Sequence, residues 1–193
     1  MKLIVKEIFY SLQGEGGRAG EASVFIRLCK CNLNCTFCDT DFEEGKEMAL
    51  QDIKEEIEKY PAKWIIWTGG EPTLQLKEAH TAYFHNLGYK QAIETNGTRE
   101  VPKGIDYISC SPKINYKEIK RKLPVANEIR IPVQAGDEIP GISILPQAEK
   151  YYLSPVFEGD SPNFENINYV VSYIEQHPEW ILSLQLHKLI NIE

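Results

Sequence analysis

Short apolar runs recur along the chain with helical stretches between them, and this alternation restricts the folds open to it. The runs predict strands over residues 3–10, 23–28, 64–68, 91–95, 106–109, 128–133 and 151–153. Periodic apolar positions predict helices over residues 50–60, 77–87 and 167–176. Strands that alternate with helices are typical of an α/β fold with a mostly parallel sheet.

Signals at the ends of these segments support the assignment. Pro61 ends the first helix, and Gly88 stands where a left-handed cap would end the second. Near the end of the chain, Leu182, Leu184 and Leu186 alternate with polar residues. This alternation predicts a final strand over residues 181–187 with one polar edge.

The length of the chain decides between a complete and an incomplete barrel. A full (β/α)8 barrel typically needs about 250 residues, and this chain has 193. We therefore predict an incomplete, TIM-like barrel with mostly parallel strands. No repeat or linker divides the sequence, so residues 1–193 are expected to form a single domain. Ligands in such sheets collect at the carboxyl ends of the strands.

Composition narrows the function classes. The formal net charge is −7, which argues against a nucleic-acid partner. The basic run at residues 117–122 is interrupted by an acid and is interpreted as a solvated helix face. The apolar runs are too short for a signal peptide or a transmembrane helix, so no membrane role is expected. The five cysteines are clustered rather than spread as a disulfide framework, which favours the reducing cytoplasm.

Three of these cysteines form one C-x3-C-x2-C motif, at Cys31, Cys35 and Cys38. Such spacing lets one loop wrap a 4Fe-4S cluster. Electron-transfer clusters usually have four cysteine ligands. Three ligands leave one iron open to bind a small molecule, so the motif indicates a cluster that performs chemistry.

Two alternatives remain for these thiols: a zinc site and a closed cluster. A zinc site needs a fourth ligand, and His80, the next histidine, lies far outside the usual spacing. Cys29 is the better rival ligand, because it lies two residues before the motif. Cys110 is interpreted as a small buried hydrophobic residue.

A second motif follows the apolar run at residues 64–68. The sequence Gly69-Gly70-Glu71-Pro72 has paired glycines that allow a ligand to approach the backbone closely. A glycine pair alone is usually only a turn. Together with the cysteine motif, it resembles the radical S-adenosylmethionine (SAM) superfamily, in which the open iron chelates adenosylmethionine.

The resemblance extends over nearly the whole chain to one family, the 7-carboxy-7-deazaguanine synthases of queuosine and archaeosine biosynthesis. The segments that carry it are 11–16 (SLQGEG), 25–28 (FIRL), 31–40, 68–72 (TGGEP), 94–98 (ETNGT), 111–113 (SPK) and 184–188 (LQLHK). The most specific are the LQGEG sequence and the Cys-Asp-Thr that begins at the third cluster cysteine. The family implies a lyase that converts 6-carboxy-5,6,7,8-tetrahydropterin to 7-carboxy-7-deazaguanine with loss of ammonia.

The resemblance also implies residue roles and cofactors. The cofactors would be a 4Fe-4S cluster on Cys31, Cys35 and Cys38, S-adenosyl-L-methionine, and Mg²⁺ on Thr40. The adenosylmethionine contacts would be Phe37, Cys38, Asp39, Gly70, Ser111, Pro112 and Lys113. The substrate contacts would be Leu12, Gln13, Gly14, Glu15, Arg27 and Thr68. Flavodoxin or ferredoxin would supply the electron, and relatives are homodimers.

Several assignments have a physical reading of their own. Arg27 lies in an apolar strand and needs an anionic partner, either a substrate carboxylate or an internal Glu15 or Glu21. Gln13 and Glu15 can hydrogen-bond a pterin ring, or they can be solvated side chains of a turn. Thr40 alone would be read as a helix cap or loop residue.

Other residues receive no role. His80, His85 and His177 are interpreted as surface or helix-face residues, and His187 as a structural or substrate-contacting residue of the last strand. The family pattern differs at Cys29 and Lys30 and matches weakly at residues 154–157. A substrate contact by the terminal Glu193 stays open.

Two other functions share these motifs. One is an activase that installs a glycyl radical on a partner enzyme with the same cluster. The other is a non-catalytic iron-sulfur carrier, which would need a fourth ligand such as Cys29. The sequence does not decide whether the product feeds transfer RNA or DNA modification.

Overall fold

A computed structural model describes residues 1–35 and 42–192. Within them one mixed sheet has the strand order β3-β1-β2-β4-β5-β6-β7-β8-β9. The strands are β1 (Lys2–Leu12), β2 (Ala22–Leu28), β3 (Lys46–Ala49), β4 (Trp64–Gly69), β5 (Lys90–Thr95), β6 (Tyr107–Cys110), β7 (Val125–Val133), β8 (Gln147–Pro155) and β9 (Ile181–Leu182). The helices are α1 (Leu50–Ile57), α2 (Glu78–Asn86), α3 (Tyr116–Lys122), α4 (Phe164–Gln176) and α5 (Leu186–Leu189), with short 3-10 turns η1 (Gly16–Arg18), η2 (Pro72–Leu74) and η3 (Ile142–Ile144).

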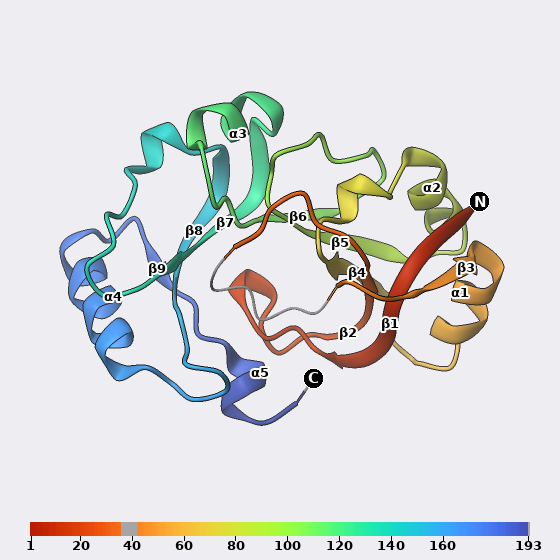
Figure 1. The fold of residues 1–193 in the computed structure, drawn as a ribbon, viewed down its shortest axis with the longest axis horizontal. Coiled ribbons are helices and arrows are strands. Elements are labelled where there is room, and N and C mark those ends of the chain that lie inside the picture. The colour runs from red at the N-terminus through yellow and green to blue at the C-terminus, as the bar shows by residue number, and fades with distance from the viewer. Residues whose placement is uncertain (36–41, 193) are drawn as a thin grey trace.

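The sheet is mostly parallel and open. Strand β2 and strands β4 to β9 pair in parallel, whereas β1 is antiparallel to both β2 and β3. Figure 1 shows helices α1 to α4 on the outer side of the curved sheet. Because the order ends at β3 and β9, the curved sheet is the incomplete barrel that the length predicts.

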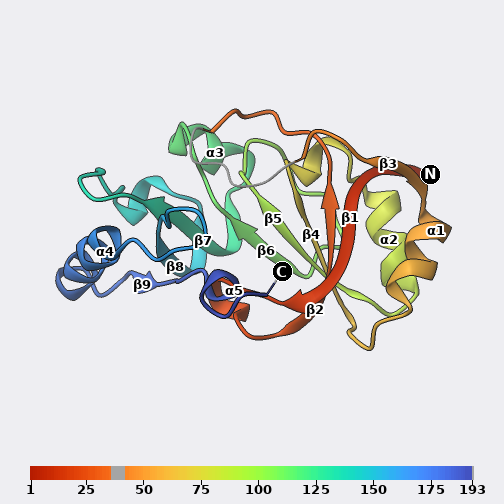
Figure 2. The same cartoon turned by 60° about the horizontal axis from the view of Figure 1, so that its bottom comes forward.

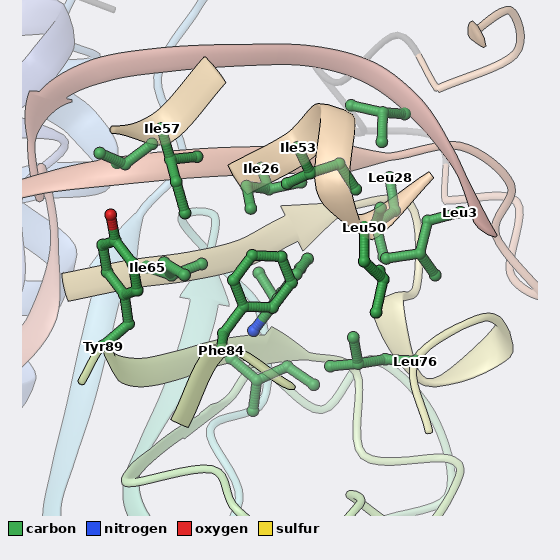
Figure 3. Close-up of a cluster of buried hydrophobic side chains, with 14 of the residues drawn as sticks. Leu3, Ile26, Leu28, Leu50, Ile53, Ile57, Ile65, Leu76, Phe84 and Tyr89 are labelled. Atoms are coloured by element: carbon green, nitrogen blue, oxygen red, sulfur yellow. The ribbon is translucent and has the colours of Figure 1, made fainter. Parts of the chain in front are cut away.

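Two apolar clusters attach the helices to the sheet. The first packs α1 and α2 against β1, β2 and β4, and Figure 3 shows it. The periodic residues Leu50, Ile53 and Ile57 of α1 are all buried there, as their spacing predicts. The second cluster packs α3 and α4 against β7 and β8 around Trp180. The sheet is therefore supported along its outer side, and its inner side is left for a cavity.

The predicted elements are largely confirmed, with the helix at 50–60 ending earlier, at Ile57. Gly88 has a φ of +83°, so it is the left-handed residue expected after α2. Strand β3 was not predicted, because its residues Lys46–Ala49 are half exposed and carry no apolar run.

The strand predicted over residues 181–187 is wrong beyond Leu182. The chain turns away after β9, and Leu186–Leu189 form the helix α5. The backbone N–H of Leu186 donates to the carbonyl of Gly14 at 2.8 Å, which fixes α5 beside the β1–β2 loop (Figure 2). Of the two interpretations of His80, surface or helix face, the surface one is wrong. His80 lies on α2 but is buried, and its Nδ1 accepts a hydrogen bond from the N–H of Lys77 at the start of that helix.

Candidate active site

A cavity of about 1220 Å³ opens at the carboxyl ends of the parallel strands. The ends of β4, β5 and β8 contribute Thr68, Thr95 and Pro155 to its lining, and Ser111 follows β6. The β1–β2 loop and the loop with Cys31 and Cys35 also line it. Groups from distant parts of the sequence therefore meet where an α/β sheet is expected to bind a ligand.

The structure brings most of the predicted site residues into this one cavity. Those that line it are Leu12, Gln13, Gly14, Glu15, Arg27, Cys31, Cys35, Thr68, Gly70, Ser111 and Lys113. Pro112 is buried and does not line the cavity. Phe37, Cys38, Asp39 and Thr40 lie outside the described residues.

The β1–β2 loop is held in a defined shape on the cavity wall. The backbone N–H of Gln13 donates to the carbonyl of Glu21 at 2.9 Å, and that of Gly20 donates back to Gln13 at 2.8 Å. A side chain at Gly14 would overlap the imidazole ring of His187. Gly14 therefore allows α5 to close against the loop, and His187 lines the same cavity.

Four polar side chains form a network at this wall. Nη1 of Arg130 donates to Oε2 of Glu15 at 2.6 Å, and Nη2 pairs with Oε2 of Glu94. Nε2 of Gln13 donates to the other oxygen of Glu94 at 2.9 Å. Two carboxylates and one amide, from the β1–β2 loop and the end of β5, are thus joined through a guanidinium on β7.

A third carboxylate, Glu128, supports the network from behind. It is buried and accepts hydrogen bonds from the N–H of Gly17 at 2.7 Å, the hydroxyl of Tyr107 at 2.8 Å and the hydroxyl of Ser109 at 2.9 Å. Burial and the bond to Glu128 raise the pKa of Tyr107 well above its usual value, so this phenol stays a donor. Glu128 therefore fixes the back of the β1–β2 loop.

Arg27 lines the same cavity from a different strand, β2. Its Nε donates to Oε1 of Glu7 at 2.6 Å, and its guanidinium lies over the ring of Phe9. The internal partners expected from the sequence are wrong. Glu15 pairs with Arg130 and Glu21 pairs with Arg18, whereas the antiparallel register places Glu7 directly beside Arg27.

The cysteine loop and the Gly-Gly-Glu-Pro loop support each other. The N–H of Glu71 donates to the carbonyl of Lys30 at 2.9 Å. A side chain at Gly70 would overlap that same Lys30 carbonyl, so only glycine fits beneath Cys31. On the other side, Nδ2 of Asn32 donates to Oγ1 of Thr98 at 2.8 Å.

Glu71 is a structural residue of this motif. It is fully buried, and its carboxylate accepts from Thr73 N at 3.1 Å, Thr73 Oγ1 at 2.6 Å, Thr95 Oγ1 at 2.8 Å and Asn96 N at 2.7 Å. One side chain thereby joins the loops that follow β4 and β5. Its position explains why an acid follows the glycine pair.

The two other cysteines lie away from the cavity lining. Cys29 is buried and its Sγ packs against Gly45, which weakens the case for Cys29 as a fourth cluster ligand. Cys110 is also fully buried, and this burial raises the pKa of its thiol, as expected for a hydrophobic role.

The residues present fit a cluster with a bound adenosylmethionine. Cys31 and Cys35 offer two thiols on the cavity wall, and Gly70 keeps the adjoining backbone free of side chains. Nζ of Lys113 donates to Oγ of Ser111 at 2.7 Å, so two polar groups stand at the neighbouring strand end. Thiolates are the protein ligands that iron-sulfur clusters use.

Sequence reasoning missed Arg130. It lies between Ile129 and Ile131 in an apolar strand, which is the same signal that singled out Arg27. Its partners stand 115 and 36 residues away along the chain, so no local pattern identifies them. Glu94 was noted only as part of a motif.

Comparisons with known proteins show the family to which this chain is similar. The Radical SAM superfamily matches residues 26–139. A 7-carboxy-7-deazaguanine synthase of Bacteroides thetaiotaomicron is 43% identical over 188 residues, which cover 97% of each chain. A 7-carboxy-7-deazaguanine synthase of Haemophilus influenzae is 43% identical over 199 residues, and the match covers 98% of this chain and 93% of that protein.

Among solved structures, the crystal structure of QueE from Escherichia coli superposes with a TM-score of 0.76 at 24% identity. The match covers 97% of this chain and 95% of that one. It confirms the fold expected from the sequence, the partial barrel of the radical SAM type. In the described part of the chain, none of the helices has the length and apolar character to span a bilayer.

Proposed function

This chain belongs to the radical SAM superfamily and, within it, to the 7-carboxy-7-deazaguanine synthases, and we propose that it converts 6-carboxy-5,6,7,8-tetrahydropterin to 7-carboxy-7-deazaguanine with loss of ammonia. One observation carries the proposal. The thiols of Cys31 and Cys35 and the polar wall of Gln13, Glu15 and Arg27 line the same cavity. A substrate on that wall would face the cluster.

The family implies a 4Fe-4S cluster and adenosylmethionine, and Cys31, Cys35 and Cys38 would hold the cluster. When bound, these cofactors supply the one-electron reduction and the hydrogen removal that begin the rearrangement. Gly70, Ser111, Pro112 and Lys113 are proposed to bind adenosylmethionine, together with Phe37, Cys38 and Asp39. Gly70 would do so through its backbone, which lines the cavity, and Lys113 through its ammonium.

The substrate would contact both Arg27 and the network of Gln13, Glu15, Glu94 and Arg130, which line the same cavity. Arg27 would bind the pterin carboxylate, because a guanidinium matches a carboxylate in geometry and charge. Gln13 and Glu15 would hydrogen-bond the ring, while Leu12, Gly14 and Thr68 would line its faces. These side chains bind and orient the substrate and exclude water, which protects a reactive intermediate.

Magnesium, an electron donor and a dimer are part of the same proposal. Thr40 would supply a hydroxyl to Mg²⁺, with substrate and water as the remaining ligands, which is usual for this ion. Flavodoxin or ferredoxin would deliver the electron, and the enzyme would act as a homodimer. These parts rest on the family resemblance.

The test is an anaerobic assay of the reconstituted protein with dithionite, adenosylmethionine and 6-carboxytetrahydropterin. We expect deazaguanine product without any partner protein, which a glycyl-radical activase would not give. Absence of product from a protein with a full cluster would contradict the proposal.

A matched pair of cysteine variants tests the ligand set. Cys35→Ser should lose bound iron, because it removes one of three ligands. Cys29→Ser should keep its iron and its spectral response to adenosylmethionine. Loss of the cluster in Cys29→Ser would instead support a closed, four-cysteine carrier.

A further inference from the structure

Arg130 is the most completely enclosed charged group at the cavity wall. Its side chain is 6% exposed, whereas those of its partners Glu15 and Glu94 are 23% and 21% exposed. A buried guanidinium is costly unless it is paired. Arg130 is paired with both carboxylates, so the most buried charged residue of the wall holds Glu15 and Glu94 in place.

The guanidinium cannot turn toward a ligand without breaking this arrangement. Its Nε makes no hydrogen bond, but it lies 3.4 Å from Oε1 of Glu128, which Tyr107 and Ser109 hold in turn. The charge of Glu128 therefore attracts Arg130 from the side away from Glu15 and Glu94. Its role differs from that of Arg27, whose pair with Glu7 lies at a more exposed part of the wall.

Glu15 and Glu94 come from separate elements and would repel each other without the guanidinium. With it, each carboxylate turns one oxygen to Arg130, and Gln13 links the two residues. Nε2 of Gln13 donates to Glu94, and Oε1 of Gln13 accepts from the N–H of Glu15 at 3.2 Å. Ionised carboxylates only accept hydrogen bonds. The result is a fixed, acceptor-rich edge on the cavity wall.

We propose that Arg130 is a positioning residue that fixes Glu15 and Glu94 as paired acceptors and thereby selects a ring with an N–H-rich edge. A 2-amino-4-oxo pyrimidine edge, as in a pterin, presents such donors. Its 2-oxo counterpart, a lumazine, presents a carbonyl oxygen where the amino group would be. A site built for an amino donor rejects the analogue that carries a carbonyl there, because that oxygen faces carboxylate oxygens, forms no hydrogen bond with them and is repelled by their charge. The inference rests on the proposed function and deepens it.

The test measures equilibrium binding of 6-carboxypterin and 6-carboxylumazine to the reconstituted full chain, without adenosylmethionine so that no turnover occurs. Wild type should prefer the pterin strongly. In Arg130→Met, pterin affinity should fall by about tenfold or more while lumazine affinity changes little, so that the preference collapses. Arg130→Lys should restore part of the preference, because an ammonium keeps the charge but lacks the planar fork.

Arg18→Met is the matched control. Arg18 is similarly buried, with a side chain 7% exposed, pairs with Glu21 and does not line the cavity. Its loss should lower the melting temperature and leave the pterin preference intact. If Arg130→Met does not fold, Arg130→Lys and Glu94→Gln carry the test, and both should reduce the preference.

The outcomes separate this inference from the proposed function. If folded Arg130 variants keep the wild-type preference, Arg130 has only a structural role and the inference is wrong. If wild type binds neither compound, the proposed function fails and the inference fails with it.

Discussion

At the residue scale, the pair of Arg27 and Glu7 competes with the proposed substrate. Both side chains are partly exposed, at 24% and 47%, and their contact is 2.6 Å long. A substrate carboxylate that binds Arg27 must share the guanidinium with Glu7 or displace it. Glu7 therefore moderates the affinity of the site for a carboxylated ring.

Glu7→Gln should tighten binding of 6-carboxypterin by up to about fivefold, because an exposed ion pair contributes about 0.2–1 kcal/mol. Pterin without the carboxylate should bind equally to both proteins. Competition binding measurements on wild type and Glu7→Gln would check this. Equal gains for both ligands would show that Arg27 does not meet the carboxylate.

Single residues show what local sequence patterns can and cannot predict about the core and the site. Leu50, Ile53 and Ile57 were predicted to be buried because a helical stripe is a local property. The partner of Arg27 was not predictable, because it depends on the register between β1 and β2. Arg130 was missed for the same reason, since its ion pairs join distant segments. Local periodicity therefore predicts helices and strands, whereas the ion-pair partners of a side chain are known only from the tertiary structure.

At the element scale, Glu71 joins the loops that follow β4 and β5 through four accepted hydrogen bonds. Glu71→Gln keeps the shape of the side chain, but its amide NH2 then faces the N–H and hydroxyl donors that the carboxylate accepted. We expect a loss of about 2–4 kcal/mol in the free energy of unfolding, because a buried donor is left unpaired. Denaturant unfolding checks the loss.

Exposed Glu100 supplies the control for this change. Glu100→Gln should leave the unfolding midpoint nearly unchanged. If Glu71→Gln were equally harmless, the two loops would not depend on this carboxylate for their position.

Helix α2 should make stability depend on pH through His80. Burial, with a smaller effect of Lys77, lowers the pKa of His80 below its ordinary 6.5. The folded state therefore favours the neutral ring, whose Nδ1 accepts from Lys77 N. The stabilisation is complete above pH 6.5 and is lost as the pH falls through the lower folded pKa.

His80→Asn should flatten this dependence, because asparagine keeps an acceptor without titrating. Urea midpoints at about pH 7.5 and about pH 5 would be compared for the two proteins. Wild type should lose more stability than His80→Asn over this interval. Equal losses would assign the acid sensitivity to other groups.

The same element scale explains the incorrect last strand. The alternation at Leu182, Leu184 and Leu186 is a correct strand pattern, but pairing with β8 stops at Leu182. The chain then bonds to the β1–β2 loop through Leu186 and Gly14. The hydrogen bond between Leu186 and Gly14, which are 172 residues apart, therefore outweighs the local preference of this segment for a strand.

At the scale of the whole molecule, the cavity is lined by strands that belong to both apolar clusters. Arg27 and Thr68 extend from strands of the first cluster, whereas Arg130 and Pro155 extend from strands of the second. A bound pterin would therefore link both halves of an open sheet whose edges do not meet. Ligand binding should stabilise the molecule as a unit.

At a 6-carboxypterin concentration about 100 times its Kd, the expected stabilisation is about 2.7 kcal/mol, or a rise in Tm of roughly 5–10 °C for a chain of this size. Thermal unfolding measures the rise, and Arg27→Met should reduce it because the carboxylate contact is lost. Amide hydrogen exchange should slow at the ends of both β2 and β7. Protection of only one of these strands would place the ligand in one half of the cavity and contradict a site shared between the halves.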